Sequence, residues 1–181
     1  MYQFNYSLTD KDYFDFNKYH MCNAPAMKKM ITGLRILLIA LLFFSLLSSL
    51  RNHSDATSLL ALIIVYTAVS VAWFFAVKPY LVFLTKINIK LIKKDGKLPY
   101  GKNVLINFEE DFFVEATNDT EIKGKYKSVE KIAVAGDAIY IYISAMQAFI
   151  LPISVFESTA QKNEFLEFIN GKKRELDIPN I

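Results

Sequence analysis

The chain has 181 residues, of which 53% are hydrophobic, and its formal net charge is only +3. Its single cysteine excludes an internal disulfide and any multi-cysteine metal site. The charge is unevenly distributed, because seven lysines and one aspartate lie between Lys78 and Lys102, whereas residues 103–181 hold thirteen acidic and eight basic side chains. An acidic distal domain argues against nucleic-acid binding, which needs a basic face.

Residues 1–30 are predicted to form an N-terminal cytoplasmic segment with a strand and a short helix. Alternating aromatic residues predict the strand over residues 2–9. Thr9 is the predicted N-cap of a helix that runs to about His20, since acidic residues follow it in the first turn. The helix is expected to end at the Asn23-Ala24-Pro25 sequence.

Residues 31–77 are predicted to form a transmembrane helical hairpin. Two apolar stretches, Ile31 to Leu50 and Ser58 to Val77, flank a polar loop over residues 51–57. A helix of about 20 residues spans the ~30 Å hydrocarbon core of a bilayer. Arg35 lies near the start of the first stretch, where its long side chain can reach the headgroups. The alternative of two core helices in a soluble domain conflicts with the apolar residues on every face.

Basic residues near the spans predict the orientation. Lys28 and Lys29 precede the hairpin and several lysines follow it, whereas the loop offers only Arg51. Cytoplasmic loops carry the excess of lysine and arginine, so both termini are expected in the cytoplasm. The predicted location is therefore the cytoplasmic membrane, with two spans.

Residues 78–99 are predicted to form a cationic amphipathic helix. One face carries lysines spaced four, three and four residues apart: Lys86, Lys90, Lys93 and Lys97. We name these four residues the lysine stripe and expect it to contact anionic lipid headgroups, at ~1 kcal/mol per lysine near the surface. The alternative is a solvated helix face whose charge only sets topology. Asp95-Gly96 predicts the end of this helix.

Residues 100–176 are predicted to form a small antiparallel β half-barrel or sandwich that a C-terminal helix caps, followed by a tail at 177–181. Alternating apolar residues predict six strands, at 104–108, 112–117, 122–126, 129–135, 138–144 and 147–153. A capping box over Ser158 to Gln161 opens the helix, whose inward stripe is Phe165, Phe168 and Ile169. The fold class is therefore a membrane α+β protein.

Four motifs in a fixed order carry a family resemblance. They are Leu8-Thr9-Asp10-Lys11-Asp12-Tyr13, the apolar hairpin, Ile106 to Phe112, and Gln147 to Pro152 with Phe156 and Glu164-Phe165. Together they resemble the YcxB-like membrane proteins of bacteria over nearly the whole chain. The C-terminal domain of that family is similar to bacterial pleckstrin-homology-like (PH-like) modules. The resemblance implies fold and topology, and it implies no catalytic residues.

The sequence shows no catalytic, cofactor or metal motif. His20 and Cys22 lie two residues apart with no third ligand nearby, and neither a glycine-rich phosphate loop nor a GxSxG elbow occurs. We therefore expect no enzyme and no cofactor, but a membrane protein that presents a PH-like binding module at the inner face of the membrane. The alternative is an accessory subunit of a membrane complex, in transport or envelope-stress regulation, that acts through its hairpin.

Small residues recur every four positions in both apolar stretches, at Ser45 and Ser49 and at Ala68, Ala72 and Ala76. Such spacing lets helices approach closely. We expect these residues to pack within the hairpin, and a homo-oligomer is the alternative. The expected partners are the bilayer, its anionic headgroups and an unknown protein.

Overall fold

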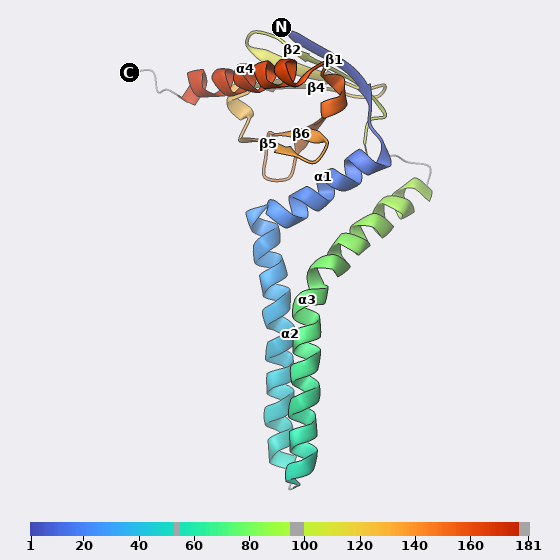
Figure 1. Ribbon diagram of the computed structural model, residues 1–181, viewed down its shortest axis with the longest axis vertical. Helices are drawn as coiled ribbons and strands as arrows, with labels where there is room; N and C mark the ends of the chain where they lie inside the picture. Colours follow the sequence, from blue (N-terminus) through green and yellow to red (C-terminus); the bar gives the residue numbers. More distant parts are fainter. Residues whose placement is uncertain (53–54, 95–99, 178–181) are drawn as a thin grey trace. The chain divides into compact units, whose positions relative to one another are not determined.

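The computed structural model describes residues 1–52, 55–94 and 100–177. The chain divides into two compact units, Met1–His20 with Asn88–Ile181, and Met21–Ile87. The first unit contains the β-strands, and the second contains the hairpin of two long helices (Figure 1).

A four-stranded antiparallel sheet forms one layer of the first unit. Its order is β1 (Tyr2–Ser7), β2 (Asn103–Phe108), β3 (Phe112–Ala116) and β4 (Glu121–Lys125). β1 pairs with β2 from Tyr2 opposite Phe108 to Ser7 opposite Asn103. The N-terminal strand is therefore part of the distal domain, and our division into separate segments at 1–30 and 100–176 does not follow the compact units. Pairing with β2 supplies hydrogen-bond partners for backbone groups that an isolated strand would leave unpaired.

A three-stranded antiparallel sheet forms the second layer. Its order is β5 (Lys131–Ala135), β6 (Ala138–Tyr142) and β7 (Ala148–Pro152). Gly136 has a φ of 59° in the turn between β5 and β6, a conformation that favours glycine. The two sheets share one aromatic core, which includes Phe108 and Phe113 from the first sheet and Ile141 and Phe149 from the second.

Helix α4 (Thr159–Asp177) closes this core. The Ser158 hydroxyl oxygen accepts a hydrogen bond from the Gln161 N–H at 3.1 Å, which confirms the predicted cap. Phe165 and Ile169 are completely buried, and the Phe165 ring lies 4.9 Å from the Phe108 ring, centroid to centroid. Phe168 is only half-buried. The predicted inward stripe is therefore confirmed, with Phe165 at its centre. The 3-10 turns η1 (Tyr126–Ser128) and η2 (Ile153–Val155) complete the domain.

Helix α1 (Asp10–Asn23) covers the other face of the second sheet. Its cap is reciprocal, because the Asp12 N–H donates to the Thr9 hydroxyl at 3.3 Å and the Thr9 N–H donates to the Asp12 carboxylate at 2.8 Å. Phe16 and Tyr19 lie 5.4 and 5.2 Å from the Tyr140 ring, between centroids. Since β6 is covered on both faces, all five of its residues are buried.

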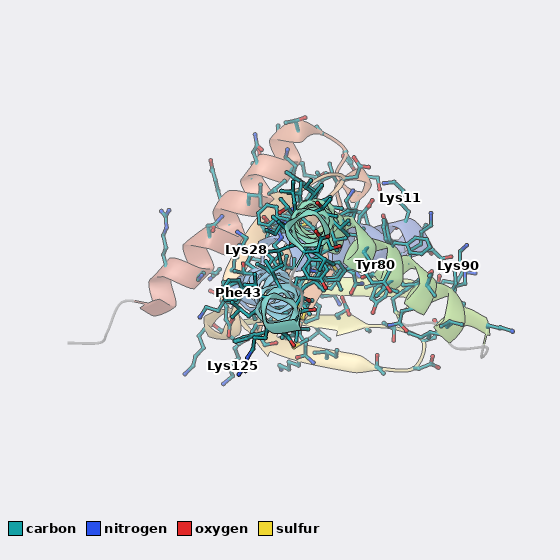
Figure 2. The ribbon with its side chains drawn as sticks, turned by 90° about the horizontal axis from the view of Figure 1, so that it is seen from below. Lys11, Lys28, Phe43, Tyr80, Lys90 and Lys125 are labelled. Carbon is teal, nitrogen blue, oxygen red and sulfur yellow. The ribbon has the colours of Figure 1, made fainter. Side chains whose placement is uncertain are left out.

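The second unit is built from α2 (Pro25–Asn52) and from α3 (Ala56–Lys94) as far as Ile87, and the two helices lie side by side in both views (Figures 1 and 2). The Trp73 indole N–H donates to the Leu34 carbonyl at 3.1 Å, and the Ser45 and Tyr66 hydroxyls lie 2.9 Å apart. Helix α3 continues through Pro79 to Lys94, so the predicted cationic helix at 78–99 is the end of one long helix in the described residues. Figure 1 shows α3 bent, as expected of a helix with an internal proline.

Candidate functional site

The lysine stripe lies at the end of α3. Lys86 and Lys90 are exposed, and Figure 2 shows Lys90 projecting away from the helix ribbon. Lys97 and the predicted stop at Asp95-Gly96 lie outside the described residues. Lys86 and Lys90 therefore present free surface for a charged ligand, but Lys93 has a different environment.

Lys93 forms an ion pair with Asp10 at the start of α1. The Tyr100 hydroxyl donates to the other oxygen of the same carboxylate at 2.6 Å. The hydrogen bonds from Lys93 and then from Tyr100 lower the pKa of Asp10 below its ordinary value. Lys93 therefore joins the end of α3 to the start of α1. The spacing of the lysines in the sequence did not indicate this ion pair.

Few residues in the apolar stretches of the hairpin are fully buried. Only 6% of the most apolar stretch of each helix is buried, and Phe44 and Phe75 are 66% and 71% exposed. Both helices are long and apolar enough to cross a membrane by length and composition. A core helix of a soluble protein would instead be mostly buried. Figure 2 looks along the helices and shows side chains radiating from them, with Phe43 among them.

Two features mark the contact between α2 and α3. The Arg35 guanidinium carbon lies 4.2 Å from the centroid of the Phe74 ring, within cation–π range. On α3 the half-buried or buried positions recur every three or four residues, and they are Leu59, Leu62, Tyr66, Ser70, Trp73 and Val77. Arg35 therefore contacts α3 near the start of the first apolar stretch.

The alanines of α3 do not form this contact. Ala68, Ala72 and Ala76 are all exposed, so our prediction that they pack within the hairpin is wrong. Larger side chains hold the helices together instead. Ser45 does contact the other helix as predicted, since its hydroxyl is hydrogen-bonded to that of Tyr66. The alanine repeat thus forms a narrow exposed strip on α3.

An open hollow of about 490 Å³ lies beside β4. Four of its lining residues are lysines that come from three elements: Lys123 and Lys125 from β4, Lys127 from η1 and Lys172 from α4. We name it the lysine groove. Its other lining residues are Glu110, Asp111, Phe112 and Tyr126. Half of the eight basic residues in 103–181 therefore gather at one place.

Strand register positions the lysines of β4. Lys125 lies opposite Phe112 on β3, and the Lys123 ammonium lies 3.4 Å from the centroid of the Phe112 ring. The Tyr126 hydroxyl donates to the Glu109 carbonyl at 2.7 Å, which fixes the turn at one end of the groove. Burial raises the pKa of Tyr126, so this hydroxyl keeps its proton at neutral pH. Among the described residues, Lys123, Lys125 and Lys127 form no ion pair.

This groove was not predicted from the sequence. Residues 122–126 were predicted as a strand with one inward face, and that alternation places Lys123 and Lys125 together on the outer face. The available signal was the repetition of lysine at every second position from 123 to 127 in an otherwise acidic domain. The spacing does not indicate that Lys172, which lies in α4 nearly fifty residues later in the chain, lines the same groove.

Metal-ligating residues do not cluster in the part of the chain that the structure describes, where no group of three or more His, Cys, Asp and Glu side chains is suited to hold an ion. The His20 ring lies 6.0 Å from the Tyr142 ring and 6.1 Å from the Phe16 ring, between centroids. Burial lowers the pKa of His20. This histidine therefore contacts the aromatic layer between α1 and the second sheet.

Comparison with known protein families matches residues 108–169 to the family model described as YcxB-like protein. This confirms the resemblance inferred from the sequence motifs. The match runs from the end of β2 into α4, so it includes the closing motif and the lysines of β4 but neither the N-terminal motif nor the hairpin. Comparisons with curated proteins and with solved structures gave no match.

Proposed function

We propose that the protein is a non-enzymatic membrane protein whose α2–α3 hairpin anchors a PH-like binding module at the inner face of the cytoplasmic membrane. The observation that carries this proposal is the exposure of large apolar side chains on both helices, since only 6% of the most apolar stretch of each helix is buried. Water would solvate such a surface poorly, at ~25 cal/mol for each Å² of apolar area. A bilayer removes that cost.

The favourable insertion energy supports the anchor. Leucine, isoleucine, phenylalanine and valine each contribute ~0.3–0.6 kcal/mol at the centre of a membrane helix. The stretch from Ser58 to Val77 has eleven of these residues and no charged residue, which gives several kcal/mol in total by the same scale. The one charged residue in the first stretch, Arg35, lies over the Phe74 ring near the start of its span.

The architecture of the first unit supports the binding module. Two antiparallel sheets enclose one core and α4 closes it with Phe165, which is the arrangement expected of a PH-like domain with its C-terminal helix. The YcxB-like match over residues 108–169 covers most of these elements. A small domain of this kind offers strand edges and open grooves for binding, and the lysine groove is one of them.

The orientation rests on the basic residues that flank the two helices. Lys28 and Lys29 lie on one side with the lysines that follow Val77, and the short connection between the helices offers only Arg51. By the positive-inside rule both termini face the cytoplasm. The binding module then lies on the cytoplasmic side.

Cysteine labelling tests this topology in intact cells. In a Cys22→Ser background, Thr57→Cys samples the exposed first turn of α3, at the end of the hairpin where α2 and α3 are connected, and Asp119→Cys samples the exposed turn between β3 and β4. An impermeant thiol reagent should label position 57 in intact cells and position 119 only after the membrane is opened. Labelling of position 119 in intact cells would refute the proposal.

The exposed alanine strip favours a second candidate function, an accessory subunit of a membrane complex. Ala68, Ala72 and Ala76 leave room for the close approach of another helix. Ala72→Leu should then release a co-purifying membrane partner in mild detergent, whereas Val71→Leu on a neighbouring exposed position should not. Equal recovery of the partner with both variants would reject this candidate.

A further inference from the structure

We propose that the lysine groove binds an acidic segment of a partner protein, which adds to the edge of β4 as an extended strand. The inference deepens the proposed binding role and rests on it, because it names the chemistry of the partner. It depends on the position of β4 in the sheet, on the spacing of its lysines, and on the shape of the hollow beside it.

β4 is an edge strand. The sheet order β1-β2-β3-β4 gives it one neighbour, β3, so among the described residues no strand pairs with the backbone N–H and C=O groups along its other side. An extended peptide can form main-chain hydrogen bonds with such an edge. Exposure supports access, since every residue of β4 except Gly124 is exposed.

The lysines define the chemistry of the added strand. Lys123 and Lys125 lie on the same face of β4, about 7 Å apart, because two residues of a strand span that distance. Acidic side chains at alternate positions of a paired strand have the same spacing and lie opposite the lysines. Figure 2 shows the Lys125 side chain directed outward from the sheet.

The other residues that line the groove also favour an acidic extended segment. Lys127 and Lys172 add positive charge at one end, and the Phe112 ring provides an apolar wall. Glu110 and Asp111 also line the hollow, and their carboxylates oppose a compact polyanion such as a phosphorylated headgroup. An extended chain places its acidic groups beside the lysines of β4 and at a distance from this turn.

A simpler use of these lysines is protection of the edge against unwanted strand pairing. Protection requires only that the lysines stay solvated along β4. It does not account for the convergence of lysines from β4, η1 and α4 on one hollow of about 490 Å³. If the lysines only protect the edge, an acidic peptide should not bind to β4. If they form a binding site, it should bind in a saturable way.

The test uses the full chain in uncharged detergent micelles. The probe is a fluorescein-labelled nonapeptide of alternating glutamate and threonine, and the control peptide has glutamine for glutamate. Fluorescence anisotropy should show saturable binding of the acidic peptide only. The variant with Lys123→Gln and Lys125→Gln should bind it about fivefold more weakly, the loss expected for two cross-strand charge pairs in the middle of their usual range. The matched variant with Lys18→Gln and Lys162→Gln removes equal charge outside the groove and should bind within about twofold of the wild type.

Backbone methylation distinguishes strand addition from simple charge attraction. Only alternate N–H groups of a strand point toward its neighbour. Two acidic peptides, N-methylated at the odd or at the even positions, should therefore differ, with one binding like the parent and the other losing binding. Equal behaviour of the two methylated peptides would overturn the strand-addition model.

Two further outcomes complete the test. If the double lysine variant fails to fold, as judged by circular dichroism, Lys125→Glu with a lysine–threonine peptide provides a charge-reversed pair. If glycerol phosphate binds with the same lysine dependence and the acidic peptide does not, the groove is a headgroup site and the proposal is wrong. Peptide binding in micelles does not depend on which way the protein is oriented in a membrane. A failure to bind the peptide would therefore refute the strand-addition proposal alone, and the labelling of positions 57 and 119 tests the proposed anchor separately.

Discussion

Gly124→Ala should destabilise the β domain, because no space exists for a methyl group at this position. Gly124 lies opposite Phe113 in the pairing of β3 with β4, and a Cβ placed on it would lie 2.4 Å from Cζ of the Phe113 ring. The ring is completely buried and cannot move aside. The Phe149 ring lies 5.1 Å away and the Tyr126 ring 5.6 Å away, between centroids.

The expected cost is ~1–3 kcal/mol, the range for overpacking a dense core. For a domain of this size each kcal/mol lowers the melting temperature by ~4–8 °C. The measurement is thermal unfolding followed by near-UV circular dichroism of the tyrosines. Eight of the ten tyrosines lie in or against the two cores of the β domain, whereas the single tryptophan, Trp73, reports on the hairpin.

Gly171→Ala provides a matched control, because the same substitution should here raise the stability of the domain and not lower it. Gly171 lies inside α4, and an added Cβ has nothing within 4 Å. Alanine in a helix interior should stabilise by ~0.5–1 kcal/mol over glycine. Phe113→Leu should relieve part of the clash when it is combined with Gly124→Ala. The double variant should therefore lose less stability than the sum of the two single variants. A Gly124→Ala protein that melts at the wild-type temperature would refute the packing of Phe113 over this glycine.

Three other predictions follow from the same structure. Phe165→Ala should cost ~3–5 kcal/mol because its ring is completely buried, and the half-buried Phe168→Ala should cost clearly less; equal denaturant midpoints for both variants would contradict the position of α4. Burial raises the pKa of Glu115 from 4.5 to about 7, so its contribution to stability is fully present below pH 4.5 and is lost as the pH rises through 7. Glu115→Gln should therefore stabilise the domain at pH 8 and not at pH 4, which unfolding at the two pH values can check. A peptide of residues 78–100 should bind anionic vesicles and release them in 1 M salt, where the Debye length falls to ~3 Å. Glutamine in place of its four stripe lysines should abolish that binding, and unchanged binding would leave the stripe as a topology signal only.

Local sequence patterns predicted most of the elements. The period-two alternation identified the strands from Asn103 to Pro152, and the Ser158 cap identified the start of α4. These features depend on neighbours within a few residues, so the sequence contains their full cause. The pairing of β1 with β2 joins segments about a hundred residues apart, and no local rule indicates which edge accepts the N-terminal strand.

Lysine spacing explains why the binding surface was harder to predict than the fold. Spacings of four and three residues placed Lys86, Lys90 and Lys93 on one helical face, yet Lys93 pairs with Asp10, a residue that local spacing does not relate to α3. Spacing of two placed Lys123 and Lys125 on one face of a strand, where no described residue forms an ion pair with them. In each case periodicity determines which side chains share a face, but tertiary contacts determine whether their charge is neutralised inside the protein or is free for a ligand. A lysine pattern in a chain of this kind therefore indicates a binding surface only after the acidic residues around it have been located.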